Sequence, residues 1–326
     1  MEAAAAPASK NVLRRTRNLA DRIGDDALKI VTGAAAVLAL VVIAAIIWKV
    51  IEGAWPAVRH FGLSFVWHGV WNPVFGHEAY GARNFIIGTL VTSFGALLLA
   101  APLSIAIALF LTELAPRAIR GPVGSLVEML AAVPSVVVGL WGIFVLGPFV
   151  NDHLGPFLQR WLGFLPFFKG EPQLTGYLPA VIVLTIMILP ITASVARELF
   201  LSVPGDVEEA ALALGATRWE MIRGVVLPHT RGGLVAAVML GLGRAVGEAI
   251  AVTQVIGDTL GIHLSLFENG DTLASRIASQ YQAAATNIHI ASLVYLALVL
   301  LVFSLATNVA AQLIVRRFEY QRVGGD

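Results

Sequence analysis

Two charged side chains, Arg244 and Glu248, interrupt an otherwise apolar stretch of the sequence. A charged residue at the centre of a membrane helix is costly, by about 2.5–3.5 kcal/mol for arginine on insertion scales. Because the two residues are four apart, they would share one face of a helix and could pair. Glycines at 241, 243 and 247 would let a second helix or a solute approach the backbone closely. The spacing therefore predicts a polar site inside a membrane span.

Three roles are open for this pair. Arg244 and Glu248 could neutralise each other and fix helix packing, or they could relay protons as in a secondary transporter. In the third role, Arg244 offers its planar, permanently charged guanidinium to an oxyanion in transit. Glu248 would then orient Arg244 and temper its affinity, or accept a hydrogen bond from a protonated oxyanion such as hydrogen phosphate. Ser135, next to Pro134, is a further candidate donor to a passing oxyanion, although such serines commonly bond to their own helix backbone.

The composition indicates an integral membrane protein and excludes several kinds of enzyme. Of the 326 residues, 57% are hydrophobic and 13% are charged, whereas a soluble domain carries about a quarter charged residues. The chain has no cysteine, and its 7 histidines form no i,i+4 pair, so a thiol nucleophile and a helical zinc site are not expected. No phosphate-binding loop ending in Gly-Lys-Ser/Thr is present. We therefore expect no catalytic residue, metal or cofactor in this chain.

Apolar segments long enough to cross a bilayer are spread along the chain. The first is 30–51, and the others lie at about 85–112, 124–148, 178–201, 232–257 and 289–315. Prolines at 102, 134 and 190 interrupt three of these spans and predict either packing kinks or helix breaks that line a pathway. The aromatic segment 52–84 is predicted to lie at the external membrane interface.

The distribution of basic residues predicts the orientation of the chain in the membrane. Most of the 22 lysines and arginines fall in the two tails, 1–29 and 316–326, or in segments 113–123 and 197–231. Cytoplasmic loops carry the excess of such residues. We therefore expect both termini and the 204–228 segment to lie in the cytoplasm.

The 204–228 segment carries charges between two apolar spans. Acidic residues after Pro204 suit the first turn of a helix, and Gly215 with Thr217 predicts its end. A second helix is expected to begin at Trp219 and to be limited by Pro228. The segment thus predicts a helix, a turn and a second helix on one membrane face.

The spacing within this segment resembles the EAA loop of bacterial ABC importer permeases. That motif reads Glu-Ala-Ala, three residues, Gly, nine residues, an aliphatic residue, any residue and Leu-Pro. The matching positions are Glu209, Ala210, Ala211, Gly215, Val225, Leu227 and Pro228, with valine where isoleucine is commoner. The resemblance implies a coupling helix that docks into a separate ATPase. An ordinary interfacial amphipathic helix is the alternative interpretation.

Other stretches resemble the PstC permease family of bacterial phosphate-specific ABC importers. They are Ala131–Gly142, Ile188–Ile191, Gly243–Glu248 and Trp71–Val74. This resemblance, from about residue 60 to the end, implies an all-α membrane protein of the type I ABC importer permease (MetI-like) fold with six transmembrane helices. The permease core would be 85–315, and Arg244 and Glu248 would serve the passage of phosphate.

The same resemblance implies a set of partners in the bacterial cytoplasmic (inner) membrane. They are the homologous permease PstA, a PstB ATPase dimer that binds ATP and Mg, and the phosphate-binding protein PstS. Alternatives are an ABC importer for another oxyanion or small solute, and a secondary transporter without an ATPase. Internal inverted repeats would favour the secondary transporter, and none is evident in the sequence.

Overall fold

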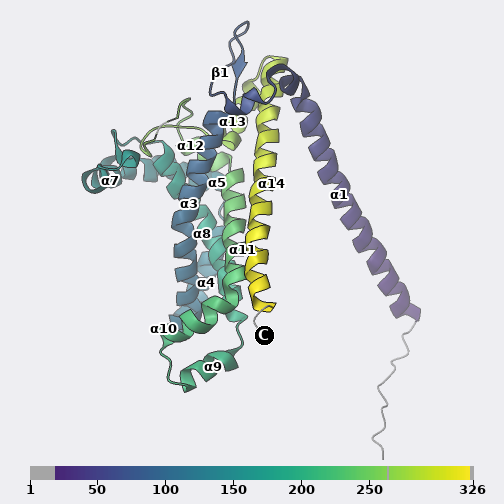
Figure 1. Cartoon of the computed structure of the whole chain (residues 1–326), viewed down its shortest axis with the longest axis vertical. Coiled ribbons are helices and arrows are strands. Elements are labelled where there is room, and N and C mark those ends of the chain that lie inside the picture. The colour runs from purple at the N-terminus through teal and green to yellow at the C-terminus, as the bar shows by residue number, and fades with distance from the viewer. Residues whose placement is uncertain (1–18, 263, 324–326) are drawn as a thin grey trace, which may run out of the picture. The chain divides into compact units, whose positions relative to one another are not determined.

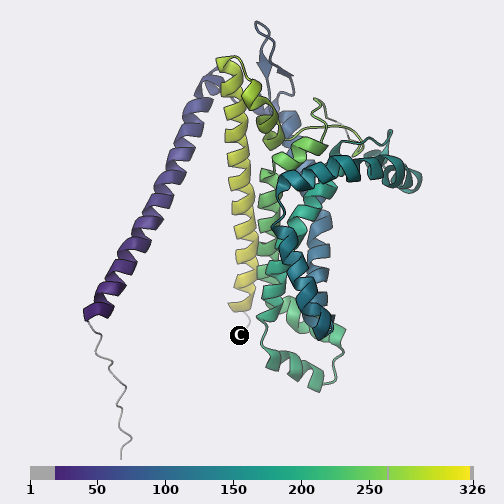
Figure 2. The same ribbon diagram turned by 180° about the vertical axis from the view of Figure 1, so that it is seen from behind.

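The computed structural model describes residues 19–262 and 264–323, and most of these are helical (Figures 1 and 2). The chain divides after Glu52 into two units. In the first unit, helix α1 (Leu19–Phe61, continuing beyond the unit) begins before the predicted first span at 30. Its portion Ile23–Phe61 is long and apolar enough to cross a membrane. The part of the predicted tail before residue 19 lies outside the described residues.

Long helices form the bundle of the second unit. They are α3 (Arg83–Leu109), α8 (Tyr177–Leu201), α11 (Leu227–Gly247) and α14 (Asn287–Val323), and they run side by side in both views (Figures 1 and 2). The Ser104 hydroxyl of α3 donates a hydrogen bond of 3.1 Å to the Leu189 carbonyl of α8. Lipid is as apolar as leucine, so close packing and such interhelical bonds stabilise the bundle.

The three interrupting prolines have different outcomes. Pro102 lies inside α3 and Pro190 lies inside α8, and both helices continue through them. Pro134 instead separates α4 (Arg117–Ala131) from α5 (Ser135–Trp141). The predicted span 124–148 is therefore two helices rather than one.

The predicted span 232–257 is also wrong as a single helix. Helix α11 ends at Gly247, and Ile250–Val255 forms a separate short helix, α12. The Glu248 backbone has the extended angles φ −73° and ψ 116°, which stop the α-helical hydrogen-bond pattern.

Short π-helical turns bend other parts of the chain. One, η1 (Phe110–Leu114), ends α3. After α5, the chain continues through the π-turn η2 (Gly142–Leu146), α6 (Gly147–Phe149) and the π-turn η3 (Val150–Leu154). It then forms α7 (Gly155–Leu162) and the 3-10 turn η4 (Pro166–Phe168). Such turns displace a helix axis. Accordingly, α7 projects away from the α3–α8 pair (Figures 1 and 2).

The predicted interfacial segment 52–84 is more structured than expected. The end of α1 continues to Phe61, and α2 (Ser64–Trp67) leads into a hairpin of β1 (Trp71–Asn72) and β2 (Ala79–Tyr80), with Trp71 opposite Tyr80. Phe65 stacks on Tyr295 of α14 with the ring centroids 4.2 Å apart. Only some of the aromatic rings are exposed, because others form a packed cluster with α13 (Leu273–Gln280) and α14. The turn η6 (Tyr281–Ala283) joins these two helices.

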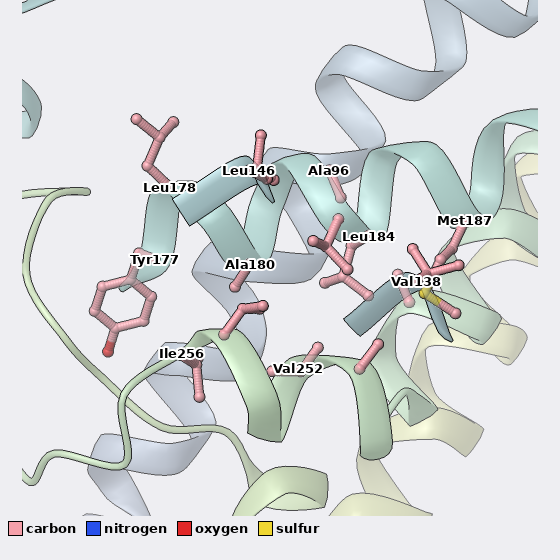
Figure 3. Close-up of a cluster of buried hydrophobic side chains, with 14 of the residues drawn as sticks. Ala96, Val138, Leu146, Tyr177, Leu178, Ala180, Leu184, Met187, Val252 and Ile256 are labelled. Atoms are coloured by element: carbon pink, nitrogen blue, oxygen red, sulfur yellow. The ribbon is translucent and has the colours of Figure 1, made fainter. Parts of the chain in front are cut away.

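At the opposite end of the second unit lie α9 (Gly205–Ala213), α10 (Arg218–Met221) and the π-turn η5 (Ile222–Val226) (Figure 1). Between the two ends, the main apolar core joins α8 to α3, α5 and α12. Figure 3 shows Val252 of α12 and Ile256, the residue that follows α12, beside Ala180 and Leu184 of α8. Packing in this core fixes the position of the short helix α12 against the bundle.

Candidate functional site

Two helix breaks lie beside each other in the bundle. One break, at 132–134, precedes α5, and the other, at 248–249, precedes α12. The two following helices pack so closely that a methyl group on Gly139 of α5 would lie 2.9 Å from the Ala251 Cα and 2.5 Å from the Gln254 Oε1 of α12. Irregular backbone at membrane depth is tolerated where it is buried in protein or lines a cavity. The paired breaks therefore define the candidate site.

Arg244 lies next to the first break. It lines a small cavity together with residues of α4, α5 and α8 and of the break itself: Leu130, Ala131, Val133, Val138, Ile186 and Met187. The cavity volume of about 10 Å³ is close to that needed for one water molecule and is too small for an oxyanion. Arg244 is nevertheless an exposed residue on the surface of α11.

Glu248 lies at the second break and is half-buried. Its Oε1 accepts a hydrogen bond of 3.4 Å from the Ala251 backbone N–H in the first turn of α12. Within the described part of the chain, no ion pair joins Glu248 to Arg244. The predicted pairing on one helical face is wrong, because the helix ends between the two residues and redirects the second side chain.

Ser135 is the first residue of α5 and is half-buried. It lies two residues after Val133, which lines the small cavity together with Arg244. The backbone N–H groups at the start of a helix carry a partial positive charge. A hydroxyl at this position suits an anion better than a hydroxyl in the middle of a helix.

Sequence reasoning missed Gln254. Its half-buried side chain faces Gly139, and its Oε1 has no hydrogen-bond partner among the residues that the structure describes. The signal was present in the sequence as a polar residue near the end of an apolar stretch. Its relation to Gly139 depends on tertiary packing.

The EAA-like positions lie at the far end of the bundle. Glu209, Ala210 and Gly215 are exposed, whereas Ala211 and Leu227 pack against the buried cluster beneath them. Pro228 occupies the first turn of α11. The segment thus has one face anchored in the bundle and one face free, as a docking element requires.

The turn inside this segment has a defined local geometry. Gly215 has φ +90°, a conformation that non-glycine residues rarely adopt. The Thr217 Oγ1 accepts from the Glu220 N–H at 3.3 Å, and Glu220 accepts from the Thr217 N–H at 2.8 Å. This capping box makes Thr217 the N-cap of the second helix, which begins at Arg218, one residue before the predicted start at Trp219.

The segment also contacts the π-turn η1, which follows α3. The Arg218 guanidinium donates to the Glu113 carbonyl at 3.0 Å. On α9, partial burial and the nearby Glu113 charge raise the pKa of Glu208. Apolar side chains are exposed beside these contacts, including Leu214 and Trp219. An exposed apolar surface among polar residues is typical of a protein–protein interface.

Comparison with known proteins identifies the family. The family model for the binding-protein-dependent transport system inner membrane component matches residues 100–320. The chain is 43% identical over 288 residues to the phosphate transport system permease protein PstC of Pasteurella multocida, covering 87% of this chain and 89% of that protein. It is 41% identical over 305 residues to the protein of the same name from Xylella fastidiosa, covering 92% and 93%. The chain belongs to this family of inner membrane permeases.

Solved structures show the same fold in other permeases. A bacterial alginate ABC transporter, solved in complex with an alginate-bound periplasmic protein, matches with TM-score 0.58 at 19% identity, covering 90% of this chain and 97% of that chain. The MetNI methionine ABC transporter matches with TM-score 0.50 at 20% identity, covering 72% and 93%. The predicted type I importer permease (MetI-like) fold is confirmed. Within the described residues, six helices are long and apolar enough to cross a membrane.

Family membership fixes the class of protein. The chain is a multi-pass inner membrane permease of an ABC system with other subunits, and it is a transporter subunit rather than an enzyme. This agrees with the absence of a phosphate-binding loop from its sequence.

The close contact at Gly139 gives a stability prediction for the permease. A Gly139→Leu substitution should lower the melting temperature of the purified protein in detergent by a few degrees, because overpacking costs about 1–3 kcal/mol. The matched control is Gly121→Leu in α4, where an added Cβ would meet no atom within 4 Å. Equal melting temperatures for the two variants would show that α5 and α12 do not pack as described.

Proposed function

We propose that this permease is the transmembrane subunit of an ATP-driven phosphate importer, in which it forms half of the translocation pathway and couples to a separate ATPase. The observation that carries the proposal is the exposed Arg244 on a membrane-spanning helix, beside the paired helix breaks. Relatives named phosphate transport system permease protein PstC support phosphate as the solute.

The exposure of Arg244 points to a second permease chain. A guanidinium in a membrane span cannot face lipid without a large cost, so such residues face protein or water. The cavity beside Arg244 is too small for an oxyanion in this chain alone. A homologous partner, PstA, would cover this face of α11 and complete a pathway between the two chains.

The chemistry of the site suits a phosphate anion. Arg244 would donate two parallel hydrogen bonds to two oxygens of the anion, and the permanent charge would compensate for its lost hydration. Ser135 would add a hydroxyl donor. Glu248, held apart from Arg244, would be free to accept a hydrogen bond from hydrogen phosphate. Sulfate has no such proton at neutral pH, so Glu248 would favour phosphate.

The exposed face of the 204–228 segment would bind the motor. In this proposal Glu209, Ala210 and Gly215 contact a PstB ATPase dimer, which binds ATP and Mg, while Ala211, Leu227 and Pro228 tie the segment to the bundle. The excess of basic residues in the two tails and in the 197–231 segment supports a cytoplasmic position for this end and for both termini. The hairpin end would then face the phosphate-binding protein PstS.

The test is phosphate uptake by proteoliposomes that contain this chain, PstA and the PstB dimer, with PstS supplied on the outer side. Radiolabelled phosphate should accumulate only with ATP and Mg, and not when the ATPase carries an inactive site. Sulfate in excess should not compete. Uptake without ATP would identify a secondary transporter, and uptake of another oxyanion in place of phosphate would overturn the solute assignment.

A further inference from the structure

A buried charge cluster lies at the hairpin end of the permease, away from Arg244. Arg276 of α13 is only 4% exposed, and its Nε lies 2.6 Å from the Asp271 Oδ2. Its Nη2 lies 2.8 Å from the Asp258 Oδ1. The guanidinium carbon also lies 4.9 Å from the centre of the Phe85 ring of α3. These atoms are close but not aligned as hydrogen bonds, so charge attraction holds the cluster together.

The two carboxylates stand at opposite ends of one connecting segment. Asp258 follows α12, and Asp271 precedes α13. Backbone bonds bring the ends together, because the Gly270 N–H donates to Ile256 at 3.0 Å and the Thr259 N–H donates to Gly270 at 3.1 Å. Arg276 therefore closes the segment 257–272 into a loop with fixed ends.

Asp258 adopts its position at a conformational cost. It has φ +49° and is the one non-glycine residue at positive φ among those described. Aspartate tolerates this region better than most residues, but it is still strained. The ion pair with Arg276 compensates for the strain, since it holds the carboxylate where that backbone places it.

The closed loop is anchored to the long helices. The Leu273 N–H donates to the Thr89 hydroxyl of α3 at 3.0 Å. The Leu178 N–H at the start of α8 donates to the Leu266 carbonyl at 2.7 Å, and the Gly176 N–H donates to the Val255 carbonyl of α12 at 2.8 Å. Through these bonds the loop fixes the position of α12 relative to α3 and α8. The break at Glu248 separates α12 from α11.

We propose that Arg276 is a positioning residue for transport, which holds Asp258 and Asp271 together and so fixes α12, with Glu248 at its start, against α5. This inference rests on the proposed function. A buried ion pair contributes little net stability compared with apolar side chains of similar size, but removing one partner leaves an unpaired buried charge. The cluster therefore contributes a fixed position of α12 beside the pathway rather than a large net gain in stability.

The protonation of Asp271 offers an independent readout of this cluster. Burial raises the pKa of Asp271 to about 7, the charge of Arg276 opposes this shift, and the charge of Asp258 adds to it. The other groups nearby are the Tyr177 hydroxyl of α8, the uncharged Phe85 and Thr89 of α3, and His289 of α14.

The direction of the pH effect follows from the raised pKa. The folded chain binds this proton more tightly than the unfolded chain does, so the contribution of Asp271 to stability falls as pH rises from the unfolded pKa of 3.8 through about 7. Protonation of Asp271 below about pH 7 is expected to remove one of the two ion pairs of Arg276. Acidification should therefore loosen α12 and leave the fold intact.

The experiment measures the position of α12 directly. Because the chain has no native cysteine, spin labels can be placed at Leu140→Cys on α5 and Ile250→Cys on α12, both exposed positions. Their distance distribution is measured in the complete reconstituted complex, together with the maximal rate and half-saturation concentration of phosphate uptake. The variants are Arg276→Met, Arg276→Lys and Asp258→Asn, with exposed Arg160→Met as the charge-matched control.

Arg276→Met should broaden the distance distribution and lower the maximal uptake rate at least about tenfold, since the buried Asp271 and the half-exposed Asp258 lose their partner. The half-saturation concentration should change less than the rate. Arg276→Lys and Asp258→Asn should cause smaller effects in the same direction, and Arg160→Met should cause none. In the unsubstituted chain, lowering the pH from about 8 to about 6 should broaden the distribution, and Asp271→Asn should abolish this response.

Folding is checked by the melting temperature of each variant. If Arg276→Met does not fold, Asp258→Asn decides the question, because the Asp258 carboxylate is half-exposed. A folded Asp258→Asn variant with unchanged label distances and uptake would overturn the proposal. The distances do not depend on the solute, so failure of phosphate uptake in the unsubstituted complex would count against the proposed function alone.

Discussion

Replacing Arg244 with glutamine is expected to reduce phosphate uptake about a hundredfold while the complex still assembles. Glutamine keeps a polar side chain of moderate length but lacks the charge and the forked donors. Two charge-assisted hydrogen bonds lost from an anion deprived of water amount to about 3 kcal/mol, which is about a hundredfold in rate or affinity. The measurement is the initial rate of radiolabelled phosphate uptake by the reconstituted complex at saturating ATP.

Two further variants separate charge from geometry. Arg244→Lys keeps the charge but loses bidentate donation, so its uptake should fall between that of the native chain and Arg244→Gln. The control is Arg160→Gln, which removes an exposed charge from α7 and should leave uptake unchanged. Native uptake by Arg244→Gln would contradict an anion role, and helix packing against the partner would then be the better account of Arg244.

Hydropathy predicted the bounds of a long helix well where a single helix occupies the whole apolar stretch. The predicted span 178–201 and the observed α8, Tyr177–Leu201, nearly coincide. A bilayer fixes the length of such a segment, and its run of leucine, isoleucine and valine leaves no alternative structure in lipid. The helix–turn–helix structure of the 204–228 segment was also predictable, because the turn at Gly215 and the cap at Thr217 depend on local sequence.

The two helix breaks were harder to predict. Pro134 breaks a helix, whereas Pro102 and Pro190 do not, so the proline itself does not decide the outcome. The break at Glu248 has no proline at all. It depends on how α12 packs against α5 and α8. Such tertiary packing cannot be predicted from the sequence pattern alone.

The Arg276 cluster was missed for a related reason. In the sequence, Arg276 lies outside the four basic segments and is not part of any motif. Its partners, Asp258 and Asp271, lie on two sides of a connecting segment and meet only when that segment closes. Sequence spacing reveals pairs within one helix, and it does not reveal pairs formed by loop closure.

The second large effect is expected at Gly215. A Gly215→Val substitution should reduce phosphate uptake about tenfold while basal ATP hydrolysis by the complex persists. A Cβ at Gly215 would meet no atom within 4 Å, so the cost comes from the backbone alone. At φ +90° a β-branched residue is strained by roughly 1–3 kcal/mol, and relief of that strain would rotate α9 relative to α10. Uptake and ATP hydrolysis are measured on the same proteoliposomes.

Matched variants distinguish turn conformation from surface contact. Gly215→Asn adds a side chain of similar bulk, but asparagine tolerates positive φ, so its uptake should stay close to native. Gly224→Val adds the same side chain at an exposed position without positive φ, where a Cβ would also meet no atom within 4 Å. If Gly215→Val and Gly215→Asn fail equally, steric exclusion of the ATPase explains the loss. If only Gly215→Val fails, the left-handed turn itself carries the motion from the motor to the bundle.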